Sequence, residues 1–267
     1  MIASLGMYDP RWLTGANDAL WQALAKRLRD LGLTGVPPAL TRDRPIDVIW
    51  TAPDLMLAQT CGYPLTTRLH DQVTLVATPV YNAEGCDGAW HRSALIVRRD
   101  DPARDLADLA GRRAAINARD SNTGMNLLRD RVAPLAQRGR FFGQVIKTGA
   151  HARSLYAVIA GQADIAAIDA VTWALLRDRY PTIDRRIRVL GWTAATPGLP
   201  LITSAAQPPA VVAALRTALR RVLADPALAA ARAALRLNGI ALIDRAAYAV
   251  VPALEQAAIR AGYPVLA

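Results

Sequence analysis

Short apolar runs and helically spaced apolar positions take turns along most of this chain. The runs are typical of buried strands, and apolar residues three or four positions apart are typical of helices. The runs predict strands at residues 2–7, 46–50, 72–81, 93–99, 112–117, 144–149, 163–169, 187–193, 198–205 and 240–243. The spacing predicts one helix with Leu20, Leu24, Leu28 and Leu31 on one face, and others at residues 52–60, 105–111, 127–135, 151–161, 170–181, 209–225 and 246–263.

Repeated alternation of strand and helix predicts an α/β fold with largely parallel sheets flanked by helices. Two extended stretches, near residues 82–98 and 186–204, bracket a self-contained α/β block. We therefore expect two lobes joined by two extended crossovers. The first lobe would contain residues 1–90 and 195–267, including the C-terminal helices, and the second residues 91–194.

Polar and aromatic residues follow the predicted strands. Ligands of open α/β sheets bind beyond the carboxyl ends of the strands, so these residues are candidates for a recognition site. If the two lobes face each other, these residues converge on one site. They are Tyr8, Tyr81, His151 and Asp169, together with the segment "RDSNTGMN" at residues 119–126 and Tyr63 in the segment "TCGYPLT".

"RDSNTGMN" stands directly before a predicted helix. Ser, Asp, Asn and Thr at this place can simply cap the helix. They can also form an anion site, because a helix start offers N–H donors and a favourable dipole, to which Ser121 and Thr123 would add hydroxyl donors. The other candidates also have plain alternatives. His151 could be a surface or capping residue, Asp169 a cap, and the tyrosines core aromatics.

Composition narrows the function classes. The net charge is +10, but only Lys26 and Lys147 are lysines, and the arginines are scattered, without an interleaved aromatic stripe. We therefore expect no nucleic-acid partner. No apolar run reaches the ~18 residues of a membrane span. There is no coiled-coil heptad pattern, so we expect a monomer.

The sequence also suggests little cofactor chemistry. Neither glycine-rich nucleotide motif occurs, and the three histidines lack clustered cysteine or carboxylate neighbours, so we expect no cofactor and no metal. Cys61 and Cys86 could form a disulfide in an oxidising compartment, closing a loop of about 25 residues. The first residues lack the features of a signal peptide. We expect a periplasmic protein if a signal peptide has been removed, and otherwise a cytoplasmic one.

Five segments in the same order resemble the phosphate, phosphite and phosphonate class of ABC-transporter substrate-binding proteins. They are "LGMYD", "TAPDLMLAQTCGYPLTT", "VATPVYNAEGCDG", "NARDSNTGMN" and "TGAHARSLYAVIAGQADIAAIDAVTWALL". The resemblance implies the type II periplasmic-binding-protein fold and capture of a small anionic solute, such as a phosphonate or phosphate, in the cleft between the lobes. An ABC permease would be the partner.

The resemblance also assigns roles to residues. It implies that Ser121, Asn122, Thr123 and Gly124 hold a tetrahedral oxyanion together with His151. Tyr63, Tyr81 and Tyr8 would complete the pocket from the first lobe, and Asp169 would hold the rest of the ligand. Asn122 stands where the family often has a hydroxyl residue. The alternative is an enzyme or a sensory domain on the same fold, in which His151 and Asp169 would act as acid and base.

Overall fold

A computed structural model describes residues 1–267, and the chain divides by its contacts into two compact units. Unit 1 comprises residues 1–82, 87–89 and 197–247, and unit 2 comprises residues 83–86, 90–196 and 248–267. Each unit contains one five-stranded sheet. The two-residue strands β4 (Cys86–Asp87), β5 (Trp90–His91) and β11 (Thr196–Pro197) pair in a further small sheet and contain residues at which the chain changes unit.

The sheet of unit 1 has the strand order β1-β2-β12-β3-β13. Its strands are β1 (Ile2–Ser4), β2 (Leu55–Gln59), β12 (Leu201–Ser204), β3 (Val73–Tyr81) and β13 (Leu237–Ala241). The pair β1 and β2 is parallel, whereas β12 is antiparallel to both of its neighbours and β13 is antiparallel to β3.

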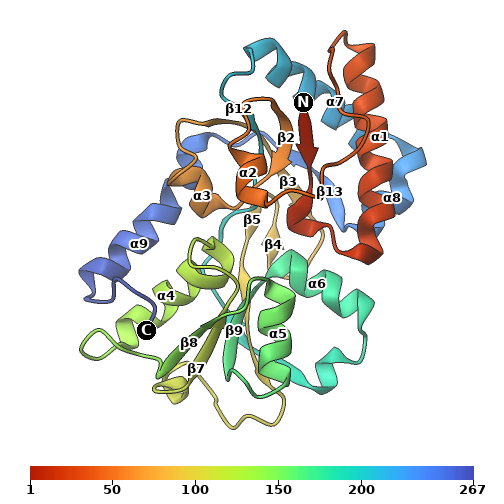
Figure 1. Cartoon of the computed structure of the whole chain (residues 1–267). Helices are drawn as coiled ribbons and strands as arrows, with labels where there is room; N and C mark the ends of the chain where they lie inside the picture. Colours follow the sequence, from red (N-terminus) through yellow and green to blue (C-terminus); the bar gives the residue numbers. More distant parts are fainter. The chain divides into compact units, whose positions relative to one another are not determined.

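The helices of unit 1 cover this sheet (Figure 1). They are α1 (Thr14–Asp30), α2 (Ile46–Trp50), α3 (Gly62–Thr66), α7 (Pro209–Ala224) and α8 (Ala229–Ala234). Helix α1 packs on α7 and α8, which in turn contact β13. As the spacing predicted, Leu20, Leu24 and Leu28 are buried on one face of α1, but Leu31 lies just beyond the helix end and is exposed.

The sheet of unit 2 has the order β10-β6-β9-β7-β8. Its strands are β10 (Ile187–Trp192), β6 (Ser93–Arg98), β9 (Ile165–Asp169), β7 (Arg113–Ile116) and β8 (Gln144–Lys147). The pairs of β7 with β8 and β9 are parallel, and those of β6 with β9 and β10 are antiparallel.

Both faces of the unit 2 sheet are covered, which explains its uninterrupted apolar strands. Along β6, Leu95 and Val97 belong to one core, while Ala94 and Ile96 belong to the core on the other face. Helices α4 (Leu127–Val132) and α9 (Val250–Arg260) contribute to the first core, and α5 (His151–Ile159) and α6 (Ala170–Arg179) to the second.

Short turns complete the elements. They are 3₁₀ turns at Gly6–Tyr8, Arg11–Leu13, Ala107–Leu109, Ala133–Leu135, Ile183–Arg185, Pro226–Leu228 and Arg245–Ala249, and a π-helical turn at Asn122–Asn126. No helix is long and apolar enough to span a bilayer.

Several predictions about elements need correction. Residues 46–50 form a helix and not a strand, and the stretch 52–60 contains strand β2 and not a helix. Both sheets are mixed, where largely parallel sheets were expected, because β12, β13, β6 and β10 run against their neighbours. The contacts of residues 248–267 place them in unit 2, whereas the sequence assigned them to the first lobe.

Candidate functional site

Ser121 caps the π-helical turn that follows β7. Its Oγ accepts a hydrogen bond from the Gly124 N–H at 3.0 Å, and its carbonyl oxygen accepts from the Asn126 N–H at 3.0 Å. A hydroxyl that accepts in this way keeps its own proton for a second partner. The cap that the sequence offered is therefore present, and the free hydroxyl proton leaves the turn a candidate for the anion site that the sequence offered as the alternative.

Gly124 is required here by a close approach and not by its backbone angles. A Cβ atom at this position would lie 1.8 Å from Asn117 Oδ1 and 3.0 Å from His151 Cε1. Both distances are shorter than any normal van der Waals contact. The missing side chain lets Asn117 and His151 pack directly against the turn.

Thr123 and His151 come from two elements that the sequence separates. Thr123 is buried in the turn, and His151 is the first residue of α5. Thr123 Oγ1 lies 3.0 Å from His151 Nε2, so one of the two atoms donates to the other. If Nε2 carries the proton, the threonine accepts, and its own O–H is left to donate to an anion.

Burial lowers the pKa of His151, while the Asp169 carboxylate and the backbone of Ala167 act in the opposite direction. Nδ1 of this histidine is buried and makes no hydrogen bond. Burial disfavours the charged form of an imidazole, so His151 is neutral at pH 7 in the structure. A bound anion would favour the charged form.

The side chain of Asn122 is engaged within unit 2. Its Nδ2 donates to Thr196 Oγ1 at 2.9 Å, and its Oδ1 accepts from Asn126 Nδ2 at 3.1 Å. Asn122 is 1% exposed. Its amide therefore holds the turn in place.

Asp169 is the last residue of β9 and caps α6, since its Oδ1 accepts from the Thr172 N–H at 2.9 Å. It is 1% exposed. Its charge also acts on two residues that the sequence did not select as ligand contacts. It opposes the lowering of the pKa of His91, which is due mainly to burial, and adds to burial in raising the pKa of Cys86 to about 12.

Tyr8 and Tyr81 pack together in unit 1. Their rings meet edge to face with centroids 5.3 Å apart, and Tyr81 Oη accepts a hydrogen bond from Gln59 Nε2 at 3.2 Å. Asn17 Nδ2 donates to the backbone oxygen of Tyr8 at 3.0 Å. Tyr63, the third predicted tyrosine, is half-buried near the start of α3.

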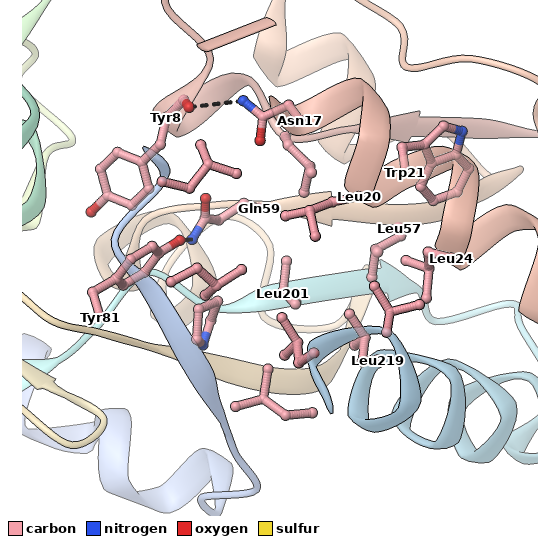
Figure 2. Close-up of a pocket in the computed structure, with 17 residues that line it drawn as sticks. Tyr8, Asn17, Leu20, Trp21, Leu24, Leu57, Gln59, Tyr81, Leu201 and Leu219 are labelled. Atoms are coloured by element: carbon pink, nitrogen blue, oxygen red, sulfur yellow. Dashed lines mark hydrogen bonds between the residues drawn. The ribbon is translucent and has the colours of Figure 1, made fainter. Parts of the chain in front are cut away.

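An apolar cavity of about 60 Å³ lies behind the two tyrosines. Figure 2 shows Tyr8, Gln59 and Tyr81 at one end, and the rest of the wall is mainly leucine, including Leu20, Leu24, Leu57, Leu201 and Leu219. The cavity is much smaller than the ~150 Å³ cavity that holds a benzene molecule. Neither residues 121–126 nor His151 line this cavity. It is therefore a void in the core of unit 1 and is separate from the candidate anion site.

The structure contains no disulfide between Cys61 and Cys86, the pair that the sequence left possible. Cys61 is buried in unit 1, and Cys86 belongs to unit 2. No group of three His, Cys, Asp or Glu side chains is arranged to hold a metal ion.

The sequence missed further residues that support the site. Ser93 Oγ donates to the Thr123 carbonyl oxygen at 2.8 Å and so links β6 to the turn. Gln59 and His91 were also not predicted. Gln59 ends the apolar strand β2 and donates to the Tyr81 hydroxyl, and His91 is a buried residue of β5 whose pKa Asp169 affects.

The fold is that of periplasmic binding proteins. A binding protein component of an ABC phosphonate transporter from Pseudomonas aeruginosa is 16% identical, with a TM-score of 0.77 over 98% of this chain and 86% of that one. PhnD1 from Prochlorococcus marinus in complex with methylphosphonate is 11% identical, with a TM-score of 0.73 over 96% of each chain. A Xanthomonas citri protein bound to chloride is 16% identical, with a TM-score of 0.72 over 98% and 97%.

The sequence itself shows the family. The family model of the phosphonate ABC-transporter periplasmic substrate-binding protein matches residues 52–248. The chain belongs to this family, whose members are binding proteins of transporters and not enzymes. A search of curated proteins finds no match.

Proposed function

We propose that this chain binds a small phosphonate or phosphate-like oxyanion at the turn of residues 121–124 and at His151. The observation that carries the proposal is the contact between Thr123 Oγ1 and His151 Nε2 at a capped helix start, because it brings two polar side chains from separate elements beside the turn. Hydrogen bonds to a charged group contribute about 1.5 to 3 kcal/mol each.

The contribution of each residue in unit 2 follows from its partners. Ser121 and Thr123 supply hydroxyl protons, and the absence of a side chain at Gly124 lets Asn117 and His151 pack against the turn. Asn122 contributes its backbone while its amide holds the turn. Asp169 supplies a buried negative charge that can attract a cationic or hydroxyl-bearing part of the ligand.

Tyr8, Tyr63 and Tyr81 of unit 1 are proposed as contacts for the ligand's remaining surface. Gln59 fixes the Tyr81 hydroxyl at 3.2 Å, and the edge-to-face pair fixes both rings. Aromatic rings with a fixed hydroxyl suit a small ligand that is partly apolar.

Membership of the family favours a periplasmic location and delivery of the solute to an ABC permease. We propose that the protein acts as a monomer and binds no nucleic acid, as its composition suggests. Thermal unfolding tests the ligand class. Protein stripped of carried-over ligand is measured with phosphate, phosphite, methylphosphonate, aminoethylphosphonate, sulfate and a small sulfonate. A ligand at 100 times its Kd stabilises the folded chain by about 2.7 kcal/mol.

We expect one phosphorus oxyanion to raise the Tm selectively in the wild type and to lose this effect in Thr123→Val. The matched control is Thr51→Val, because Thr51 is an exposed threonine whose hydroxyl bonds only to the carbonyl oxygens of its own helix. No shift with any phosphorus oxyanion would contradict the proposal.

A further inference from the structure

A chain of buried polar groups leads from residues 121–126, which we call the anion turn, to the C-terminal segment of unit 2. Asn126, the last residue of the turn, donates from Nδ2 to Asn122 Oδ1 at 3.1 Å and to the Val251 carbonyl oxygen at 3.0 Å. Asn122 in turn donates to Thr196 Oγ1 at 2.9 Å. Asn126 is fully buried, so water cannot replace these partners.

Arg129 extends this chain from α4 to α9. Its guanidinium donates to Asn126 Oδ1 at 2.7 Å and to the Pro264 carbonyl oxygen at 2.8 Å, and it lies 3.1 Å from Glu255. Arg129 is 3% exposed. A buried charge of this kind is tolerated only with a fixed set of partners. Of the three partners of Arg129, Asn126 lies in the turn, and Glu255 and Pro264 lie in the segment after residue 248.

These contacts act on the geometry of the turn. A π-helical turn is a rare conformation that needs support from outside its own backbone. Both amide atoms of Asn126 are satisfied only when Asn122, Val251 and Arg129 hold their present places. The direction of the Ser121 and Thr123 hydroxyl donors therefore depends on α9, although α9 contains none of the predicted anion contacts.

We propose that residues 248–267 position the anion turn, with Asn126, Arg129 and Glu255 as positioning residues. The match to the family model ends at residue 248, so this role is not part of what the match covers. The inference rests on the proposed function only where it concerns ligand affinity. The effect of residues 248–267 on the conformation of the turn can be measured without a ligand.

The test uses three variants in the full chain. Asn126→Asp keeps the size of the side chain and the acceptor for Arg129. It replaces the donor Nδ2 by an oxygen, which then faces Asn122 Oδ1 and the Val251 carbonyl oxygen. Glu255→Ala removes the partner of Arg129, and Glu255→Gln restores an acceptor. The control is Ile183→Ala, which destabilises the other core of unit 2 and does not contact the turn.

Two quantities are measured at a temperature where every variant is folded. Hydrogen exchange of the peptide spanning residues 119–128 reports the turn in the ligand-free protein. Calorimetry reports the Kd for the phosphorus oxyanion that stabilises the wild type. We expect Asn126→Asp to exchange at least tenfold faster in this peptide and to bind at least tenfold more weakly. Glu255→Ala should show a smaller change, and Glu255→Gln should lie close to the wild type.

Ile183→Ala should leave both quantities unchanged. Unchanged exchange at residues 119–128 in Asn126→Asp would overturn the inference, whatever the ligand result. Equal losses in Ile183→Ala and Asn126→Asp would also overturn it, because the effect would then be general destabilisation. Absence of binding by the wild type would contradict the proposed function alone, since the exchange measurement still tests the positioning role.

Discussion

Thr123 Oγ1 and His151 Nε2 lie 3.0 Å apart, although 27 residues separate them along the chain, and this contact is the centre of the candidate anion site. Removing the threonine hydroxyl should remove one donor and leave the histidine without its partner. We expect Thr123→Val to weaken oxyanion binding by tenfold or more, since a hydrogen bond to a charge contributes about 1.5 to 3 kcal/mol. Titration calorimetry measures the change, and wild-type affinity in this variant would place the anion elsewhere.

Gly124 offers a second test of the same turn. An alanine Cβ would lie 1.8 Å from Asn117 Oδ1, so Gly124→Ala must displace either Asn117 or the turn. We expect loss of detectable oxyanion binding and a lower free energy of unfolding. Gly15→Ala in α1 is the matched control, because nothing lies within 4 Å of its added Cβ. The prediction is wrong if both variants bind like the wild type.

The turn also shows how far the sequence could predict the site. Residues 121–124 and His151 were selected from their place at helix starts and from a family resemblance, and the structure brings them together. The role of the Asn122 side chain could not be predicted, because its partners Thr196 and Asn126 are set by packing within unit 2. A capping pattern is local, whereas the choice of a hydrogen-bond partner is not.

The fold illustrates the same limit. The exchange of helix and strand between residues 46–50 and 55–59 arose because both are short apolar runs, which periodicity cannot distinguish. Ile49 and Trp50 are buried while Val48 is exposed, a helical pattern too short to recognise. Strand β2 is made of good helix formers, but it is wholly buried between β1 and β12, so its tertiary position overrides its propensity.

Binding should be coupled to protonation of His151. Burial lowers the pKa of this residue in the ligand-free protein, and a bound anion would raise it, so binding takes up a proton. We therefore expect affinity to rise as the pH falls from 8 to 6, by at most about tenfold per unit. His151→Gln, titrated with the same ligand, should lack this part of the slope. Equal slopes in both proteins would contradict the coupling, because ionisation of the ligand is common to them.

His91 should make folding less stable in acid. It is completely buried, and burial lowers its pKa below the ordinary value, with the Asp169 carboxylate acting against this. At low pH the unfolded chain therefore binds a proton that the folded chain does not. The contribution of His91 to the free energy of unfolding is complete above about pH 6.5 and declines as the pH falls below this value. We expect the urea-derived free energy of unfolding to fall between pH 7 and 5, by up to about 1.4 kcal/mol per unit for each such histidine.

An NMR titration assigns the effect to His91. Its imidazole should stay neutral at a pH where an ordinary histidine is half protonated. A midpoint for His91 at or above 6.5 would disprove the prediction.

Cys86 should be chemically inert although it is only half-buried. Burial, reinforced by the Asp169 carboxylate, raises the pKa of its thiol to about 12, so only about one part in ten thousand is thiolate at pH 8. We expect iodoacetamide to modify it hundreds of times more slowly than a small-molecule thiol. Because burial is the larger cause, Asp169→Asn should accelerate the reaction only in part, and unfolding in urea should restore the full rate.

Mass spectrometry of the peptide containing Cys86 follows each reaction, and rapid labelling of the native wild type would show that the thiol is neither shielded nor held neutral. Slow labelling would also predict slow disulfide formation by Cys86, since the thiolate is the form that attacks to make a disulfide.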